Sequence, residues 1–255
     1  MDWSTKFNQF FGALSAEHWQ ALLLQGLWNT VKIAVIGLVI GIVVGTLIAI
    51  IGAAPKDKWP IKVLEKICSV YVALFRGTPM VVQLLVAYYV LIPSIGIVGA
   101  DSVTVGIIVF GLNSGAYVSE IMRGGLNSVD AGQMEAGRSL GMSYSQTMLR
   151  IVIPQAIKNI LPTLGNEFIT LIKETSVLSM ISVYDLYTAV VAIGAPFYDK
   201  VMPFLFMAII YIALVLMITL LVKVLEKALG KSDRRTTSLV EKKTFFGLKI
   251  GGGKS

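Results

Sequence analysis

The sequence predicts an all-α membrane protein with five transmembrane helices. Apolar residues make up 55% of the 255 residues and charged residues only 15%, whereas soluble domains carry about 25% charged residues. The mean hydropathy is +0.76. Five apolar stretches are each long enough to cross a bilayer, which takes roughly 20 residues. Because the rest of the chain is too short for a large soluble domain, we expect one transmembrane domain over 21–229.

Residues 1–20 are predicted to form an interfacial segment on the outer membrane surface. They lack the basic start, apolar run and small-residue cleavage site of a signal peptide. Apolar and aromatic side chains recur along them as in amphipathic segments that lie in the membrane interface. These anchors are Trp3, Phe7, Phe10, Phe11, Leu14 and Trp19.

The spans and the segments between them follow from hydropathy. The first span is rich in small residues, and Gly37 and Gly41 have the spacing of a close helix contact. A polar loop, 127–158, separates the third span from the fourth, and a basic tail, 230–255, follows the fifth. We expect the tail to be a disordered or surface-bound extension. The predicted spans cover 22–52, 61–92, 103–122, 160–182 and 203–225.

Basic residues are divided very unequally between the two sides of the membrane. Of the 22 Lys and Arg residues, three fall within spans (Lys32, Arg76 and Lys173) and only Lys6 and Lys200 fall on one side; the other seventeen share the opposite side. Because Lys and Arg are retained in cytoplasmic segments, we predict the N-terminus outside and the C-terminus in the cytoplasm. This distribution also explains the net charge of +7 without nucleic-acid binding.

No metal, cofactor or catalytic site is predicted. Cys68 and His18 are the only residues of their types, so neither has a partner at disulfide or metal-ligand spacing. The terminal GLKIGGGKS resembles a phosphate-binding loop, but Leu248 stands where that pattern requires glycine. No paired acids and no nucleophile with a base occur at usable spacing. We therefore expect a non-enzyme whose ATP hydrolysis, if any, takes place on a partner.

The polar loop is predicted to form two short helices. A helix begins near Asp130 and stops at Gly141, because glycine suits the position after a helix end. Ser143 with Gln146 three residues later is a capping-box pattern that starts the second helix. Pro154 and Pro162 punctuate the return toward the fourth span.

The loop also carries a family signature. The run Glu135-Ala136-Gly137, three residues, Gly141, nine residues and Ile151-Val152-Ile153-Pro154 resembles the EAA loop of bacterial ABC importer permeases, which reads Glu-Ala-Ala, three residues, Gly, nine residues, Ile-x-Leu-Pro. This chain differs at Gly137 and Ile153. Other segments, spread over most of residues 20–225, resemble the polar amino acid branch of these permeases. They are GLWNTVKIAVIG, LFRGTPMVVQLL, GLNSGAYVSEIMRGGLNSV and LPTLGNEFITLIKETSVLSMI.

The resemblance implies the type I ABC importer permease fold, a multi-pass location in the bacterial plasma (inner) membrane, and a role as permease subunit of ATP-driven amino acid uptake. The implied partners are two ATP-binding cassette ATPase subunits, a second permease copy or paralogue, and an extracytoplasmic amino-acid-binding protein. ATP would be bound by the ATPase subunits, leaving this chain without a cofactor. The implied coupling residues are Ala131, Glu135, Ala136, Gly137, Gly141, Ile151 and Pro154.

Arg76 is the central candidate for a substrate site, because an ionisable residue within a span is costly and is by default functional. Gly77 permits a break, Thr78 can cap a helix, and Pro79 suits the first helical position. We expect a helix interrupted and restarted at membrane depth, whose N–H groups face a substrate carboxylate. Arg76 either adds a bidentate contact to that carboxylate or forms an internal ion pair with Glu120.

The third and fourth spans supply the other candidates. Asn113, Tyr117 and Glu120 share one helix face, although polar contact between helices is an alternative role for Asn113. We hypothesise that Arg76 and Thr78 hold the carboxylate and Glu167 the ammonium group. The predicted substrate-binding residues are Arg76, Gly77, Thr78, Pro79, Gln83, Asn113, Tyr117, Glu120, Glu167 and Thr170.

The acidic side chain of Glu167 indicates the class of amino acid substrate. Many permeases that the chain resembles have glutamine or another neutral residue at this position, so the acid favours arginine, lysine or histidine, with glutamine and cystine left open. A secondary amino acid transporter is the alternative function, although such proteins usually show an internal repeat and the two halves of this sequence show none. An intramembrane enzyme is a further alternative.

Overall fold

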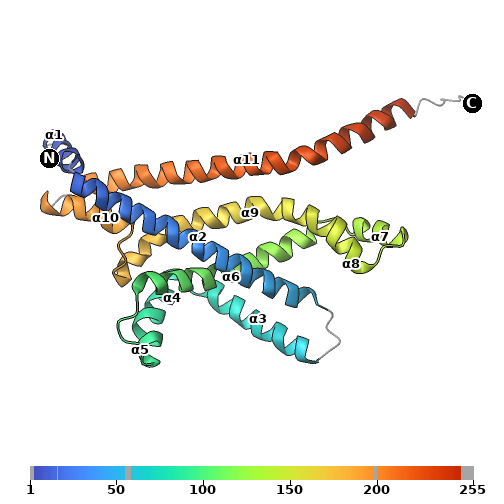
Figure 1. The fold of residues 1–255 in the computed structure, drawn as a ribbon, viewed down its shortest axis with the longest axis horizontal. Helices are drawn as coiled ribbons and strands as arrows, with labels where there is room; N and C mark the ends of the chain where they lie inside the picture. Colours follow the sequence, from blue (N-terminus) through green and yellow to red (C-terminus); the bar gives the residue numbers. More distant parts are fainter. Residues whose placement is uncertain (1–2, 16, 55–58, 198–199, 248–255) are drawn as a thin grey trace, which may run out of the picture.

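The computed structural model describes residues 3–15, 17–54, 59–197 and 200–247, and these residues form helices joined by turns, with no strand among them. The long helices lie along one direction and form an elongated bundle (Figure 1). Helix α6 (Ser102–Asn127) packs against α2 (Glu17–Ala53) and α9 (Ile153–Glu174), and α9 packs against α11 (Val201–Gly247). Helix α6 is therefore central to the bundle.

Three helices are individually long and apolar enough to cross a membrane, over His18–Ala53, Ser102–Asn127 and Val201–Ala228. Two bent pairs qualify jointly. Trp59–Gly77 and Met80–Ser94 meet at 108°, and Tyr144–Ile181 and Leu186–Gly194 meet at 61°. The described residues thus contain three spans, or up to five if each bent pair is one span, and the predicted number of five remains a prediction.

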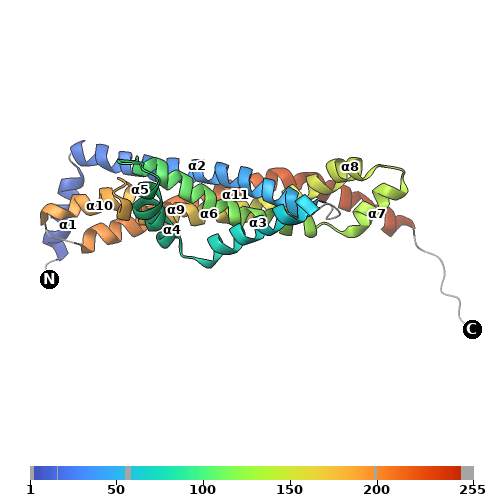
Figure 2. The ribbon, with the colours of Figure 1, turned by 90° about the horizontal axis from the view of Figure 1, so that it is seen from below.

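The first bent pair replaces the continuous second span predicted over 61–92. Helix α3 (Trp59–Gly77) runs along the bundle, and α4 (Met80–Val86) turns across it (Figure 2). Helix α4 continues through a π-helical turn, η1 (Ala87–Leu91), into α5 (Ile92–Ser94). The predicted span therefore consists of two segments of different direction.

The second bent pair extends the predicted fourth span at both ends. Helix α9 continues as a 3-10 turn, η3 (Thr175–Ile181), and α10 (Leu186–Gly194) follows the bend and ends in η4 (Ala195–Phe197). Pro154 lies in the first turn of α9, as its fixed backbone angle favours. Pro162, however, lies inside α9 and does not interrupt it.

The second bend is held by polar side chains of α2. Ser182 has a left-handed backbone with φ of 63°. The Asn29 side-chain amide donates to the Tyr184 carbonyl at 2.8 Å, and the Leu186 amide donates to the Thr30 hydroxyl at 3.1 Å. The Asp185 carboxylate accepts from the Thr188 amide at 2.9 Å and caps α10. Because unpaired backbone groups are costly in a bilayer, these bonds stabilise the bend.

Glycines bring α2 and α6 into close contact. A Cβ added at Gly41 would lie 2.6 Å from the Ser114 hydroxyl oxygen, and one at Gly45 would lie 2.7 Å from the Ser119 amide nitrogen. In return, Gly111 of α6 faces Ile40 of α2. The close helix contact predicted from the glycine spacing is confirmed, and its partner is a helix of the same chain.

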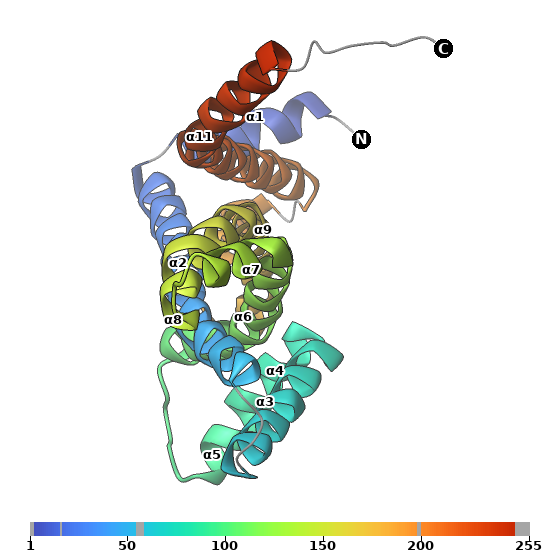
Figure 3. The ribbon, with the colours of Figure 1, turned by 90° about the vertical axis from the view of Figure 1, so that its right-hand side faces the viewer.

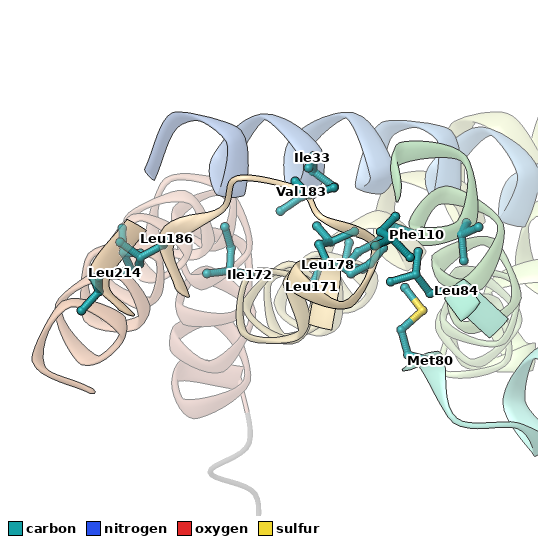
Figure 4. Close-up of a cluster of buried hydrophobic side chains, with 14 of the residues drawn as sticks. Ile33, Met80, Leu84, Phe110, Leu171, Ile172, Leu178, Val183, Leu186 and Leu214 are labelled. Atoms are coloured by element: carbon teal, nitrogen blue, oxygen red, sulfur yellow. The ribbon is translucent and has the colours of Figure 1, made fainter. Parts of the chain in front are cut away.

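A buried apolar cluster joins the bends to this helix pair. Ile33 of α2, Phe110 of α6 and Leu178 of η3 are fully buried, and Figure 4 shows them with Leu84 of α4 and Leu171 of α9. The cluster anchors the start of α4 and the end of α9 beside α6. By contrast, α2 and α11 present rows of exposed large apolar side chains on their outer faces, as surfaces that contact lipid do. They include Val39, Val43, Leu47, Ile209, Ile212 and Leu216.

The structure describes much of the predicted N-terminal interfacial segment and of the predicted C-terminal tail. The predicted interfacial segment contains α1 (Trp3–Leu14), whose Phe10 is buried with its ring centroid 5.4 Å from that of Phe206 in α11. The predicted disorder of the tail does not hold for residues 230–247, where the backbone of α11 stays helical to Gly247, and a surface-bound tail stays a prediction. Between Phe204 and Phe246 the sequence has no proline and one glycine, and extending an existing helix is far easier than nucleating one. Residues 248–255 lie outside the described part.

The α2–α6 contact yields a prediction of stability. Gly41→Val should lower the free energy of unfolding by about 1–3 kcal/mol, because the new side chain overlaps Ser114 in a packed interface. The matched control is Gly52→Val in the same helix, where an added Cβ meets no atom within 4 Å. Thermal unfolding of both variants in mild detergent measures the difference, and equal melting temperatures would contradict the packing described.

Candidate functional site

The predicted helix break is present at Thr78 and Pro79. Pro79 is the N-cap of α4, with an extended backbone (φ −64°, ψ 141°), and its carbonyl accepts from the Val82 and Gln83 amides at 3.0 and 3.2 Å. Thr78 does not cap α4, contrary to the sequence analysis; its hydroxyl donates to the Leu74 carbonyl at 2.8 Å. Because proline already fixes the extended residue ahead of the helix, the Thr78 side chain stays with α3.

Hydrogen bonds of the Gln83 side chain link the helix break to α6. Its amide nitrogen donates to the Phe75 carbonyl at 2.7 Å and to the carbonyl and hydroxyl oxygens of Thr78, both at 2.9 Å. Its amide oxygen accepts from the Asn113 side chain at 2.8 Å. These bonds satisfy carbonyls that the end of α3 leaves without helical partners. Gln83, predicted as a substrate ligand, therefore positions the break and does not line the cavity beside it.

That cavity, which we call the break cavity, has a volume of about 560 Å³ between the break, α6 and α9. It gathers most of the predicted substrate-binding residues; Gln83 and Glu120 are not among its lining residues. Met80, Leu171 and Glu174 also line it and were not on the predicted list. Seven-residue spacing from Glu167 was the signal for Glu174. The lining residues are Arg76, Gly77, Thr78, Pro79, Met80, Asn113, Tyr117, Glu167, Thr170, Leu171 and Glu174.

Glu167 contributes a buried carboxylate to the break cavity. The residue is only 9% exposed, and no basic side chain of the described residues is found within ion-pair distance of it. A buried charge without a partner is costly. The cavity wall formed by α9 therefore carries a buried acid that has no basic ion-pair partner among the described residues.

Arg76 forms the internal ion pair that the sequence left open and also lines the break cavity, while its contact with a substrate stays a prediction. Its guanidinium forms an ion pair with Glu120 at 3.2 Å and lies 5.5 Å from the centre of the Tyr117 ring. Glu120 also contacts Arg123 at 2.7 Å. The Arg76 side chain is nevertheless 44% exposed and lines the break cavity. It is thus an internal ion-pair partner that remains within reach of a ligand.

The first helix, the stop at Gly141 and the capping box of the polar loop are present as predicted, but the second helix is not a separate short one, because it continues without a break into α9. Helix α7 (Ala131–Ser139) starts after Asp130, whose carboxylate accepts from the Gly132 amide at 2.7 Å. Gly141 follows with φ of +82°, which favours glycine. Ser143 and Gln146 form the expected capping box at the start of α8 (Tyr144–Thr147), and a π-helical turn, η2 (Met148–Val152), leads into α9.

The loop presents an accessible face. Glu135 and Ala136 are exposed, and so are the large side chains of Leu140 (82%), Tyr144 and Leu149. Of the other predicted coupling residues, Ala131, Gly141 and Pro154 are exposed and Ile151 is half-buried. Exposed apolar side chains outside the bundle favour a protein contact there.

Gly137 is less accessible than the other predicted coupling residues. It is buried, and an added Cβ would lie 2.5 Å from the Thr147 methyl carbon. The replacement of alanine by glycine in the EAA pattern is therefore matched to Thr147, which packs α7 against α8. Among the described residues, no group of three or more His, Cys, Asp or Glu side chains could hold a metal ion.

One protein family and several transport permeases are similar to this chain in sequence. The family described as "Binding-protein-dependent transport system inner membrane component" matches residues 37–231. The arginine transport system permease protein ArtQ of Bacillus subtilis (strain 168) is 36% identical over 213 residues, covering 83% of this chain and 94% of ArtQ. The putative glutamine transport system permease protein GlnP of Rickettsia typhi is 38% identical over 205 residues, covering 80% and 91%. The L-cystine transport system permease protein TcyB of Bacillus subtilis is 35% identical over 211 residues, covering 82% and 87%.

Solved structures share the fold. The crystal structure of an amino acid ABC transporter with histidines superposes with a TM-score of 0.75 at 38% identity, covering 84% of this chain and 97% of that one. An inward-facing form of the MetNI methionine ABC transporter has a TM-score of 0.68 at 17% identity, covering 84% and 99%. The bent spans and the short loop helices described above thus belong to a known architecture.

The role assigned to Gln83 can be tested by removing its side chain. Gln83→Ala should lower the free energy of unfolding by about 1–3 kcal/mol, because carbonyls at the end of α3 lose their donor. Gln20→Ala is the control, since the Gln20 side chain is exposed and makes one long bond of 3.4 Å to Ser15. Thermal unfolding in detergent measures both, and a Gln83→Ala melting temperature equal to that of the control would refute the role.

Proposed function

Because the chain belongs to the family of binding-protein-dependent transport system inner membrane components, and within it to the amino acid ABC transporter permeases, we propose that its break cavity holds a polar or cationic amino acid during uptake. The fold is the type I ABC importer permease fold predicted from the sequence. The chain is the membrane subunit, and we assign ATP binding and hydrolysis to separate ATPase subunits, so that the chain itself needs no cofactor.

The observation that carries the proposal is the buried carboxylate of Glu167 in a cavity that Arg76 also lines. An amino acid has one anionic and one cationic end, and the cavity offers a group of opposite charge for each. Arg76, Thr78 and the start of α4 receive the carboxylate, since a guanidinium and a helix start both favour anions. Glu167 receives the cationic end.

A cationic amino acid is the favoured substrate. The side chain of arginine or lysine, or of protonated histidine, offers Glu167 a positive charge of its own, in addition to the α-ammonium group that every amino acid carries. Among the relatives, ArtQ is named for arginine, GlnP for glutamine and TcyB for cystine. Glutamine and cystine remain alternatives in which Glu167 binds only the α-ammonium group.

Coupling to ATP hydrolysis is assigned to α7 and α8. These helices lie at the end of the bundle where α6 stops and α9 begins, away from α1 and α10 (Figure 1), and Figure 3 shows them in front of that end. We propose that this end is cytoplasmic and docks on an ATPase subunit through Glu135, Ala136 and the exposed apolar side chains nearby. Two ATPase subunits, a second permease copy or paralogue, and an external amino-acid-binding protein complete the transporter in a bacterial plasma membrane.

Family membership argues against the secondary transporter that the sequence left open, because proteins of the ABC class draw their energy from ATP-binding subunits. Alternating access then follows from the docked loop. Closure of the ATPase pair moves α7 and α8, and α6 and α9, to which the loop is joined at its two ends, carry that movement to the break cavity.

A charge reversal tests the docking surface. Glu135→Lys should weaken association with the ATPase subunit by at least about tenfold, because a misplaced charge in an interface costs several kcal/mol. Glu226→Lys makes the same change on α11 and should leave association intact. Co-purification in mild detergent with quantified ATPase stoichiometry is the measurement. Unchanged stoichiometry in Glu135→Lys, and in Gly141→Asp as a second loop variant, would count against docking here.

A neutral replacement tests the substrate assignment. Glu167→Gln should lower arginine uptake relative to glutamine uptake by about tenfold or more, because a bond between opposite charges becomes a neutral one. Competitive uptake of labelled arginine, glutamine and cystine into proteoliposomes with the complete transporter measures the preference. Glu226→Gln is the control for loss of one carboxylate. An unchanged ratio of arginine uptake to glutamine and cystine uptake in Glu167→Gln would rule out charge selection at this residue.

A further inference from the structure

A second cavity adjoins the break cavity on its coupling-loop side. This cavity, which we call the loop-side cavity, has a volume of about 430 Å³ and lies between α6 and α9. Its polar lining includes Glu120, Ser128, Asn159 and Thr163. Ser128 follows the last residue of α6, so the cavity extends to the point where the coupling loop begins.

The two cavities follow one face of α9. Asn159 and Thr163 line the loop-side cavity, whereas Glu167, Thr170 and Glu174 line the break cavity. Successive members of this series are three or four residues apart, which places them along a single stripe of the helix. A row of polar side chains therefore runs from the break cavity to the coupling end of the membrane helices.

An ion pair separates the two cavities. Arg76 and Tyr117 line both of them, and Glu120 lines the loop-side cavity. Arg76 holds Glu120 at 3.2 Å and lies over the Tyr117 ring. Separating opposite charges in a medium of low polarity is costly unless each finds a new partner. Glu120 keeps Arg123 as a partner at 2.7 Å, and an amino acid supplies a carboxylate for Arg76 and a second cation for Glu120.

Two adjacent glycines on α6 have different surroundings. An added Cβ at Gly125 would lie 2.1 Å from a side-chain carbon of Ile160, so Gly125 packs α6 against α9. An added Cβ at Gly124 would meet no atom within 4 Å, and Gly124 lines the cavity. A larger side chain at Gly124 can therefore fill the cavity without disturbing the contact between the two helices.

We propose that the loop-side cavity is a second amino-acid site on the translocation path, entered from the break cavity when the substrate replaces the Arg76–Glu120 ion pair. The proposal rests on the proposed function. Glu120 binds the cationic end of the substrate, and the partial negative charge at the end of α6 adds to this attraction. Asn159 donates to the Ser128 hydroxyl at 2.9 Å, and this pair with Thr163 supplies neutral hydrogen-bonding groups for the remainder of the molecule.

A series of side chains of increasing volume at Gly124 tests the site. In the complete transporter, arginine uptake should fall in the order Ala, Leu, Trp, with Gly124→Trp at least about tenfold below wild type because the exit step is obstructed. The dissociation constant of arginine at the break cavity should stay within about twofold of wild type, since the break cavity is unchanged. The same substitutions at Gly12, where an added Cβ also meets nothing within 4 Å, should leave uptake unchanged.

The outcomes separate this inference from the proposed function. Wild-type uptake in Gly124→Trp would overturn the second site and leave the function intact. If neither the wild type nor the Gly12 variants took up an amino acid, the proposed function itself would fail.

A thiol measurement covers the case in which Gly124→Trp does not fold. Cys68 is the only cysteine, so a Cys68→Ser background carrying Thr163→Cys has a single thiol in the loop-side cavity. Arginine should slow its reaction with a small cationic thiol reagent at least about tenfold at saturation, and should not slow the reaction of Gly12→Cys. An unprotected thiol at position 163 would overturn the proposal.

Discussion

Glycines on successive turns let α2 lie directly against α6, and the other contacts of the bundle are arranged around this pair. Gly41 and Gly45 of α2 face Ser114 and Ser119 of α6 so closely that a single Cβ would overlap them. With one face of α6 covered in this way, Asn113 and Tyr117 are left to line the break cavity beside α3, α4 and α9. The same apposition presents Asn29 and Thr30 of α2 to the second bend.

Both bends leave backbone groups without partners inside their own helix. A helix that breaks in a bilayer exposes backbone groups that lipid cannot satisfy, and a side chain or a water-filled cavity must take over. At the first bend Gln83 provides the donors, and at the second Asn29 donates and Thr30 accepts. Some polar residues, such as Gln83, bond only the backbone and side chains at a bend, others, such as Glu167, line a cavity, and Asn113 does both.

Charged side chains extend from the break cavity toward the end of the bundle that carries α7 and α8. Arg76, Glu120 and Arg123 form a row of alternating charge from the break toward the end of α6, whereas Glu167 has no basic partner among the described residues. A paired charge stabilises one arrangement of the helices, and an unpaired one favours the arrival of a ligand. The polar loop folds without such charges. Its helices are fixed by the caps at Asp130 and Ser143 and by the glycine at 141, which act within a few residues.

The sequence by itself determined the features whose causes lie within a few residues. Gly77 to Pro79 predicted the break, Gly141 and the Ser143–Gln146 pair predicted the loop helices, and the glycine spacing predicted a close contact. Tertiary structure decided which faces meet. The Gln83 side chain bonds the carbonyls at the helix break, and the Thr78 hydroxyl bonds a carbonyl of α3. Arg76 pairs with Glu120. Asn159 and Thr163 of α9 lie beside α6. Residues far apart in the chain have no local signal for such contacts, since a span turning by 108° brings together faces that hydropathy alone cannot pair.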